Sequence, residues 1–393
     1  MKLDIIRANV ILPDQIIKNS RVTVEDGVIS GVDCQSLAPR GETIDARGAY
    51  LMPGMIDIHS DHIEQVAEPR PGCLMDIDFA LREQEKQLIN QGITTMFHSL
   101  TLFRLISPQG GDVRYGKATR DADCFRRLAD GVIAAGRRRG LIRHRLHVRF
   151  EIGGTDGLPV LTELMDSGGV SLVSFMDHTP GQGQYRDVER FRQYAERNLS
   201  AEQFAERVEQ RRAAPKLSRE ALVQAARDAR GRGIPVSSHD DDCAEKIDFV
   251  RDGLGASVSE FPVETDVARY ARSKGMATLG GAPNIMLGYS HSGNMSATDG
   301  VLDGCISCIC SDYYPPSMLQ AVFKLHTEFG LPLHETARLA TLAPAEAVGI
   351  GARIGSVAAG KAADLLVVDA SGPMARVTAA ITNGVVSSTL NYV

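Results

Sequence analysis

The sequence predicts an α/β protein, a (β/α)₈ TIM-like barrel with a small β-sandwich domain built from both chain ends. Strand-like and helical segments alternate through the middle of the chain, which is typical of a parallel sheet covered by helices. Both chain ends instead consist of short β-like runs separated by turns. We expect the small domain to span residues 1–52 and 350–393 and the barrel to span residues 53–349.

The two chain ends are predicted to pair with each other. Apolar β-like runs at residues 3–10, 21–24 and 28–32 are separated by turns such as residues 25–27, and a similar pattern returns from Ala363 onward. Neither end contains enough apolar surface to fold alone, so we expect one shared β-domain.

Eight strand-like runs are predicted to form the barrel. Helical patterns lie between several of them, for example residues 78–91 before Gly92 and residues 218–230 before Gly231. A doubly wound open sheet is the competing topology, but it would not gather polar residues from eight strand ends in one ring. The charged segment near 185–216 is predicted to be a helical excursion over a barrel face, or else an ordinary surface helix pair. The strand-like runs end near Asp61, His98, Glu151, His178, His239, Glu260, Asn284 and Asp312.

Composition and charge argue against several classes of protein. The net charge of −6 argues against general nucleic-acid binding, and no apolar stretch approaches the ~20 residues that a membrane span needs. The N-terminal segment lacks the apolar core of a secretory signal. The seven cysteines are scattered and odd in number, which argues against a disulfide framework. We therefore expect a cytoplasmic protein that binds neither nucleic acid nor membranes.

The segment from Pro53 to His62 is predicted to be a buried strand that ends in metal ligands. Residues i and i+2 of a strand face the same side, so His59 and Asp61 would point together from its carboxyl end. Imidazole nitrogen and carboxylate oxygen suit zinc, manganese or iron. One such pair is a weak indication, but the other predicted strands also end in histidines and carboxylates. In a barrel these side chains converge on one face, and metal binding would satisfy their buried charges.

The order of these motifs resembles the amidohydrolase superfamily. This chain carries the motifs of that superfamily in the same order: His-x-(Asp/His), a later carboxylate, two separated histidines and a final Asp. Residues 50–57 and 340–365 resemble the segments that join the superfamily's barrel to its β-sandwich. Further segments are similar to the phosphonate-utilisation branch, the α-D-ribose 1-methylphosphonate 5-triphosphate diphosphatases, which carry His-x-Asp at the first position. These segments are residues 59–62, 68–71, 176–182, 238–241, 281–285, 290–294 and 311–315.

The resemblance implies a metal-dependent hydrolase of phosphonate catabolism, which releases pyrophosphate from the 5-triphosphate and leaves the 5-phosphate. It implies two divalent ions (Zn, Mn or Fe) that would lower the pKa of a bridging water to near neutrality. Glu151 is our candidate for the bridging ligand, and Asp312 would also accept the proton of the attacking water. The implied metal ligands are His59, Asp61, Glu151, His178, His239 and Asp312.

Substrate contacts are expected from a second set of residues, and two alternative functions remain open. One alternative is an amidohydrolase that acts on a C–N bond, of the cyclic amide or deaminase type; the other is a catalytically silent barrel scaffold. The expected partner is a small phosphorylated substrate, with a possible homodimer and a functional link to other phosphonate-degradation enzymes. The expected substrate-binding residues are Arg70 (with Lys117 as the alternative cation), His98, Asn284 and His291.

Overall fold

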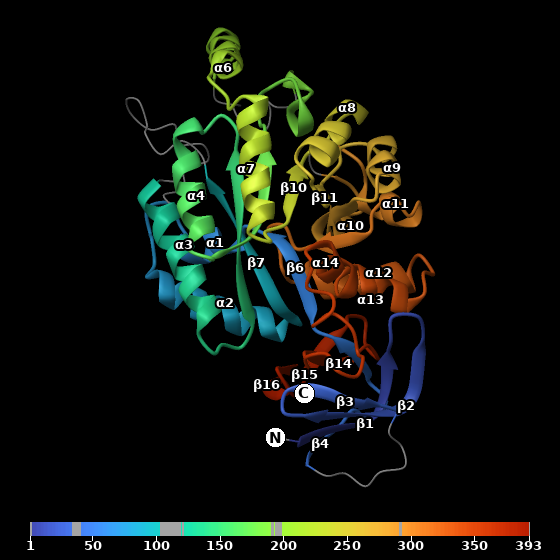
Figure 1. Ribbon diagram of the computed structural model, residues 1–393. Coiled ribbons are helices and arrows are strands. Elements are labelled where there is room, and N and C mark those ends of the chain that lie inside the picture. The colour runs from blue at the N-terminus through green and yellow to red at the C-terminus, as the bar shows by residue number, and fades with distance from the viewer. Residues whose placement is uncertain are drawn as a thin grey trace.

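Two sheets organise the computed structural model, a parallel barrel and a mixed sheet built from both ends of the chain (Figure 1). The predicted fold class is therefore confirmed. The structure describes residues 2–33, 41–102, 119, 122–189, 192, 199–290 and 293–392.

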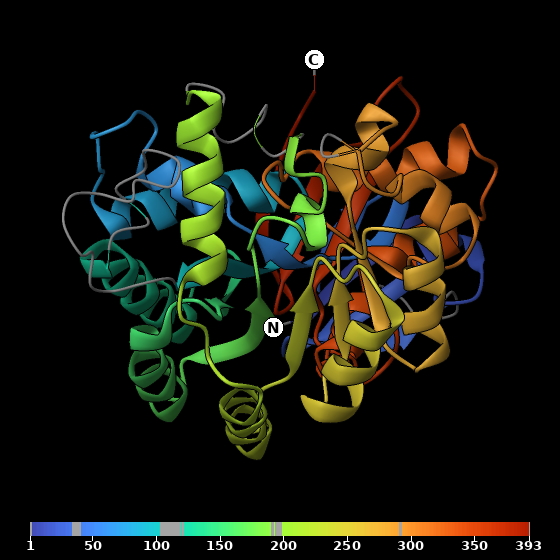
Figure 2. The same ribbon diagram turned by 90° about the horizontal axis from the view of Figure 1, so that it is seen from above.

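The barrel consists, among the described residues, of eight parallel strands that follow one another in chain order. A bridge between Ser60 and Asp312 brings the last strand back beside the first, so the barrel is nearly closed. Viewed from above, helices surround the strands (Figure 2). The strands are β6 (Met55–Ser60), β7 (Ile93–Leu102), β8 (Arg143–Glu151), β9 (Val170–Met176), β10 (Val236–His239), β11 (Val258–Glu260), β12 (Ala277–Gly281) and β13 (Cys308–Cys310).

Helices follow each barrel strand and cover the outside of the sheet (Figures 1 and 2). Two predicted helices begin at side-chain caps: Asp76 accepts from the Phe79 amide before α2, and Ser218 accepts from the Ala221 amide before α7. The helices are α1 (His62–Ala67), α2 (Ile77–Asn90), α3 (Ala122–Arg137), α4 (Leu158–Asp166), α6 (Ala201–Ala213), α7 (Arg219–Gly231), α8 (Ala244–Asp248), α9 (Thr265–Ser273), α10 (Ala282–Leu287), α11 (Ala297–Leu302), α12 (Ser317–Thr327), α13 (Leu333–Leu339) and α14 (Leu342–Ala347), with shorter turns at Thr155–Gly157, Gly183–Tyr185 and Phe249–Gly253.

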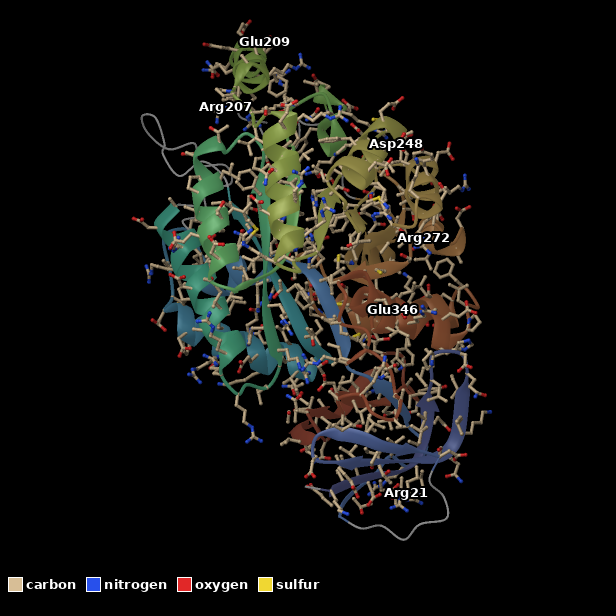
Figure 3. All side chains as sticks on the ribbon, in the orientation of Figure 1. Arg21, Arg207, Glu209, Asp248, Arg272 and Glu346 are labelled. Atoms are coloured by element: carbon tan, nitrogen blue, oxygen red, sulfur yellow. The ribbon has the colours of Figure 1, made fainter. Side chains whose placement is uncertain are left out.

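The helix α6 lies in the segment predicted to be a helical excursion, and it projects beyond the strand ends (Figure 1). Its charged side chains, such as Glu209, face outward (Figure 3). On the other side, Phe204 and Val208 pack with Tyr185 in a small apolar cluster. Among the described residues, no helix is both long and apolar enough to cross a membrane.

The mixed sheet joins the two chain ends, as the sequence predicts. Strand β14 pairs antiparallel with β5, with Leu366 opposite Met52. An ion pair between Arg21 and Asp4 is buried in this sheet (Figure 3). The strands are β1 (Lys2–Ile11), β2 (Ile16–Glu25), β3 (Val28–Val32), β4 (Glu42–Asp45), β5 (Tyr50–Pro53), β14 (Leu365–Asp369), β15 (Arg376–Thr382) and β16 (Val385–Thr389).

Polar contacts fasten the mixed sheet to the amino end of the barrel. Arg143, the first residue of β8, forms an ion pair with Asp364 and a hydrogen bond with Asn383. Gly92 packs at the same boundary with φ +89°, and a Cβ there would lie 2.8 Å from Leu366 Cδ1. The left-handed backbone favours glycine there, and the surrounding side chains leave little room for a Cβ. The opposite, carboxyl end of the barrel is left for the polar strand-end residues.

Candidate metal centre

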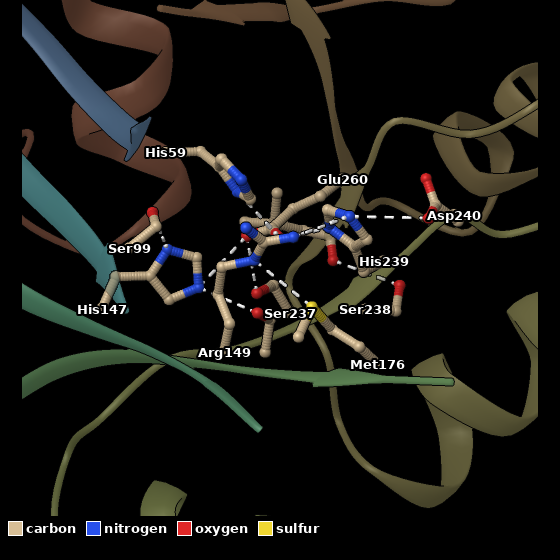
Figure 4. A network of polar contacts seen from close by, with 12 residues as sticks. His59, Ser99, His147, Arg149, Met176, Ser237, Ser238, His239, Asp240 and Glu260 are labelled. Atoms are coloured by element: carbon tan, nitrogen blue, oxygen red, sulfur yellow. Dashed lines mark hydrogen bonds and ion pairs between the residues drawn. The ribbon is translucent and has the colours of Figure 1, made fainter. Parts of the chain in front are cut away.

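Histidines and carboxylates on or just after six barrel strands meet at the carboxyl end of the barrel. Because the strands are parallel, their carboxyl ends lie at one end of the barrel, which is where barrel enzymes carry their active sites. Figure 4 shows several of these side chains pointing toward one another. His59 lies in β6. Three residues are the last of their strands: Glu151 of β8, His239 of β10 and Glu260 of β11. Three more follow a strand by one or two residues: His178 after β9, Asp240 after β10 and Asp312 after β13.

Glu260 connects two of the histidines. Its Oε2 lies 3.2 Å from His59 Nδ1 and 3.1 Å from His239 Nδ1, and the two imidazole rings stack with centroids 5.4 Å apart. Ser237 donates a hydrogen bond of 2.9 Å to the other carboxylate oxygen. Glu260 is fully buried, and its ligand atoms and those of the two histidines lie close enough for all three to hold one metal ion.

A second group consists of His178, His239 and Asp240. Asp240 Oδ2 lies 3.6 Å from Nε2 of both histidines. His178 is oriented by Glu151, whose Oε2 lies 2.6 Å from Nδ1 and whose Oε1 accepts 2.8 Å from the His178 amide. A carboxylate on Nδ1 that leaves Nε2 facing other donors is the arrangement common to metal-binding histidines.

The donor set of the second group fits a divalent cation. Asp240 Oδ2 is buried and has no hydrogen-bond partner among the described residues. Such an oxygen is costly to bury, and a cation held with the two Nε2 atoms would satisfy it. His239 faces Glu260 through Nδ1 and Asp240 through Nε2, but a neutral imidazole has only one free lone pair. We assign the proton to Nδ1, which donates to Glu260, and leave Nε2 for the metal.

The electrostatics of the site keep two of the histidines neutral. Burial, with the added effect of the nearby Arg149 guanidinium, lowers the pKa of His59 and of His239 well below the usual value. Neutral imidazoles are the form that binds metal. For His178, burial alone would lower the pKa, but the charges of Glu151 and Asp240 outweigh it and raise the pKa to about 9.

Asp312 lies beside Asp61 where the barrel closes. The Asp61 amide donates 2.9 Å to the Asp312 carbonyl, and the Asp312 amide donates 3.0 Å to the His59 carbonyl. Burial, reinforced by the Asp61 charge, raises the pKa of Asp312 to about 7. Asp312 and Asp240 both have left-handed backbone conformations, with φ of 55° and 53°. Asp tolerates this region better than most residues, and strain of this kind concentrates at functional sites.

Comparison with known proteins identifies the family. Residues 50–390 match the Amidohydrolase family. The chain belongs to the amidohydrolase family. It is 33% identical, over 376 residues, to the α-D-ribose 1-methylphosphonate 5-triphosphate diphosphatase of Escherichia coli (strain K12), with 89% of this chain and 94% of that protein covered.

Solved structures show the same fold at low identity. The N-acetylglucosamine-6-phosphate deacetylase of Pasteurella multocida has a TM-score of 0.65 at 14% identity, covering 98% of this chain and 99% of that chain. The 5-methylcytosine deaminase of Klebsiella pneumoniae has a TM-score of 0.65 at 14% identity, covering 99% and 98%. Amidohydrolases generally use divalent metals, which agrees with the donor groups described above.

The amidohydrolase barrel brings most of the predicted metal ligands to one end, but it places Glu151 differently from the bridging position that we expected. Glu151 lies behind His178, whereas the carboxylate between His59 and His239 belongs to Glu260. The sequence places Glu260 at a strand end but does not single it out as a ligand. Asp240, which directly follows His239 in the segment 238–241, was likewise expected at a strand end but was not chosen as a ligand.

The predicted substrate contacts are not brought together with these groups. Arg70 is exposed in the turn after α1. His98 is completely buried, and its Nε2 lies 2.8 Å from His144 Nδ1. Asn284 Oδ1 accepts from the Ala297 amide. No hydrogen bond or ion pair between described residues links these three side chains to the metal-binding groups, and His291 lies outside the described residues.

His98 lies away from the metal-binding groups because its strand is longer than the sequence predicts. The sequence predicts that the strand ends near His98, but β7 continues to Leu102, so His98 lies in its middle. Its ring is stacked on His144, which also bonds Glu85 of α2. Asn284 similarly lies in α10, beyond the end of β12.

Proposed function

We propose that this amidohydrolase is a metal-dependent diphosphatase of phosphonate catabolism. Its substrate would be α-D-ribose 1-methylphosphonate 5-triphosphate, and its products pyrophosphate and the 5-phosphate. The observation that carries the proposal is the match to the Escherichia coli diphosphatase, which extends over nearly the whole of both chains. The histidine and carboxylate groups at the carboxyl end of the barrel supply the donors that such a reaction needs.

The metal would be held by His178, His239 and Asp240. Glu151 and Glu260 would accept from Nδ1 of the two histidines and fix both Nε2 atoms toward the ion. When bound, a divalent cation activates water and polarises a phosphoryl group. Mixed nitrogen and oxygen donors suit zinc, manganese and iron, the ions expected from the sequence.

Asp312 would accept the proton of the attacking water. Water adds to phosphorus, the bond between the α- and β-phosphates breaks, and pyrophosphate leaves while the proton passes to the Asp312 carboxylate. General-base assistance of this kind is worth ~10²–10⁴ in rate. Asp312 lies half-buried beside Asp61 and next to the His59 backbone, so its carboxylate is held at the same end of the barrel as the histidines. His59, Asp61 and Asp312 also offer donors for a second ion.

The alternative functions have less support. The deacetylase and deaminase likenesses, at 14% identity, show the fold alone, so hydrolysis of a C–N bond has no observation of its own here. A silent scaffold would be expected to have lost some of its metal donors, whereas two donor groups are present. A cytoplasmic location, a homodimer and a link to other phosphonate-degradation enzymes stay predictions from the sequence.

Phosphorus NMR tests the proposal directly. The metal-loaded protein is mixed with ribose 1-methylphosphonate 5-triphosphate and compared with Asp312→Asn and with Asp4→Asn, a matched change of a buried carboxylate in the mixed sheet. We expect pyrophosphate and the 5-phosphate together from the wild type and from Asp4→Asn, and at most trace turnover from Asp312→Asn. If the triphosphate survives in the presence of metal-loaded wild type, the proposed substrate is wrong and C–N hydrolysis becomes the leading candidate.

A further inference from the structure

The guanidinium of Arg149 lies in the middle of the candidate metal centre. Arg149 belongs to β8, two residues before Glu151, and therefore faces the same side of the strand. Its Nη2 lies 3.4 Å from His239 Nε2, and its Nε donates to Met176 Sδ at 3.3 Å. Figure 4 shows the guanidinium between His59, Glu260 and His239.

Arg149 differs from Arg21 and Arg143 in what surrounds its charge. Arg21 and Arg143 each form an ion pair with an aspartate. Among the described residues, the hydrogen-bond contacts of Arg149 are a thioether and an imidazole, and no carboxylate lies within ion-pair distance. A thioether is a weak acceptor, and a guanidinium has five donors, so most of its capacity is left for another partner.

A cation on His239 makes the requirement for that partner stronger. Arg149 and Asp240 both face His239 Nε2, the nitrogen assigned above to the metal. Two positive charges a few ångströms apart in a buried site repel each other strongly. An oxyanion between them removes that repulsion and satisfies both. A guanidinium is also the side chain whose fork of N–H donors matches a phosphoryl group with two parallel hydrogen bonds.

We propose that Arg149 is the residue that binds a phosphoryl group of the substrate beside the metal. This inference rests on the proposed function and names a binding residue for it. It also replaces the sequence-based expectation for the cation, because Arg70 is exposed and has no described link to the metal-binding groups. The ligand class is a phosphate or pyrophosphate oxyanion held jointly by the guanidinium and the metal.

Pyrophosphate binding tests Arg149 independently of turnover. Inorganic pyrophosphate is titrated calorimetrically into the metal-loaded full-length protein and into Arg149→Gln and Arg149→Lys, with metal content and thermal unfolding measured for each. We expect Arg149→Gln to bind pyrophosphate roughly 10- to 100-fold more weakly, the range for loss of a charge-assisted bidentate contact, at unchanged metal content. The pyrophosphate affinity of Arg149→Lys should lie between those of the wild type and Arg149→Gln, because lysine keeps the positive charge but not the paired N–H donors of the guanidinium.

Arg145→Gln is the matched control, since Arg145 lies on the same face of β8 four residues earlier, and its pyrophosphate affinity should equal that of the wild type. Wild-type affinity in Arg149→Gln at equal metal content would overturn the inference, and so would a metal-loaded wild type that binds no pyrophosphate. If pyrophosphate binding depends on Arg149 but the phosphonate triphosphate is not hydrolysed, the proposed substrate fails while the role of Arg149 stands.

Discussion

Replacing Glu260 by Gln tests whether this carboxylate, rather than Glu151, supports the histidines of the centre. The carboxylate accepts from Nδ1 of His59 and His239 at 3.2 and 3.1 Å. A glutamine oxygen can occupy the same place, so the perturbation removes the charge and keeps the shape. A hydrogen bond to a charged acceptor is worth about 1 kcal/mol more than a neutral one, which gives about 2 kcal/mol for the two bonds. Because His239 would hold the first ion and His59 the second, we expect the combined affinity for the two ions to fall roughly 30-fold.

The same substitution should not unfold the protein. Glu260 is fully buried, and burial raises the pKa of its carboxyl, so the charged form is disfavoured in the metal-free fold. Glutamine carries no charge, so the substitution removes the desolvation cost of the buried carboxylate while it keeps the shape of the side chain. The combination of weaker metal binding with undiminished stability is specific to a carboxylate that acts on the metal-binding histidines.

Chelator competition at fixed pH measures the metal affinity, and urea unfolding of the metal-free protein measures the stability. Asp4→Asn is the control: it removes a buried carboxylate from the mixed sheet, so it should lower stability and leave metal affinity unchanged. A combined affinity for the two ions in Glu260→Gln that stays within about threefold of wild type would refute the reasoning, because weakening two bonds by about 1 kcal/mol each predicts a larger loss. Loss of metal only in Glu151→Gln would restore Glu151 as the main carboxylate ligand.

Three further predictions follow from charges elsewhere in the structure. Because the pKa of His178 is raised to about 9, a metal ion that binds its Nε2 must displace a proton. Metal affinity, measured by chelator competition, should therefore rise up to about tenfold per pH unit between about pH 7 and 9. An affinity that does not change with pH would contradict this. Burial raises the pKa of Asp57 to about 7, so its contribution to metal-free stability is full below pH 4 and is lost as the pH rises through 7. Wild-type unfolding free energy should therefore fall more steeply over this range than that of Asp57→Asn, by up to about 1.4 kcal/mol per pH unit, and parallel urea-unfolding profiles would contradict the assignment. Asp364→Ala leaves Arg143 without its carboxylate partner. We expect the free energy of unfolding, measured in urea, to fall by about 3 kcal/mol. A fall of less than about 1 kcal/mol would show that the ion pair does not hold the two sheets together.

The sequence predicts the barrel and its polar end well, because both depend on local patterns. An apolar run followed by His59 and Asp61 predicts a strand and its exit with no knowledge of the rest of the chain. The end of β7 was misplaced for a local reason as well. A histidine is a common strand-end residue at active sites, but the buried Ser99 and Leu100 continue the strand beyond His98.

Local sequence patterns do not predict which carboxylate pairs with which histidine at the strand ends. Glu151 and Glu260 are both carboxylates at strand ends, and nothing in the local sequence shows which of them lies between His59 and His239. That choice depends on the order of the strands around the barrel. Glu260 ends β11 directly beside β10, which His239 ends, whereas Glu151 ends β8 beside β9, which leads to His178. His239 and His178 are therefore each paired with the carboxylate of a neighbouring strand, whereas His59 reaches Glu260 from a strand that is not its neighbour.

Strand β8 shows how the fold separates stability from binding. Its first residue, Arg143, faces the mixed sheet and is neutralised by Asp364, a contact that fastens the amino end of the barrel. Arg149 lies six residues further along the same strand, at the end where the metal donors meet, and has no carboxylate in ion-pair contact among the described residues. Parallel barrels place their chemistry at the carboxyl ends of the strands. In this chain the charge of Arg143 is satisfied within the fold, and the charge of Arg149 remains available to an anionic ligand.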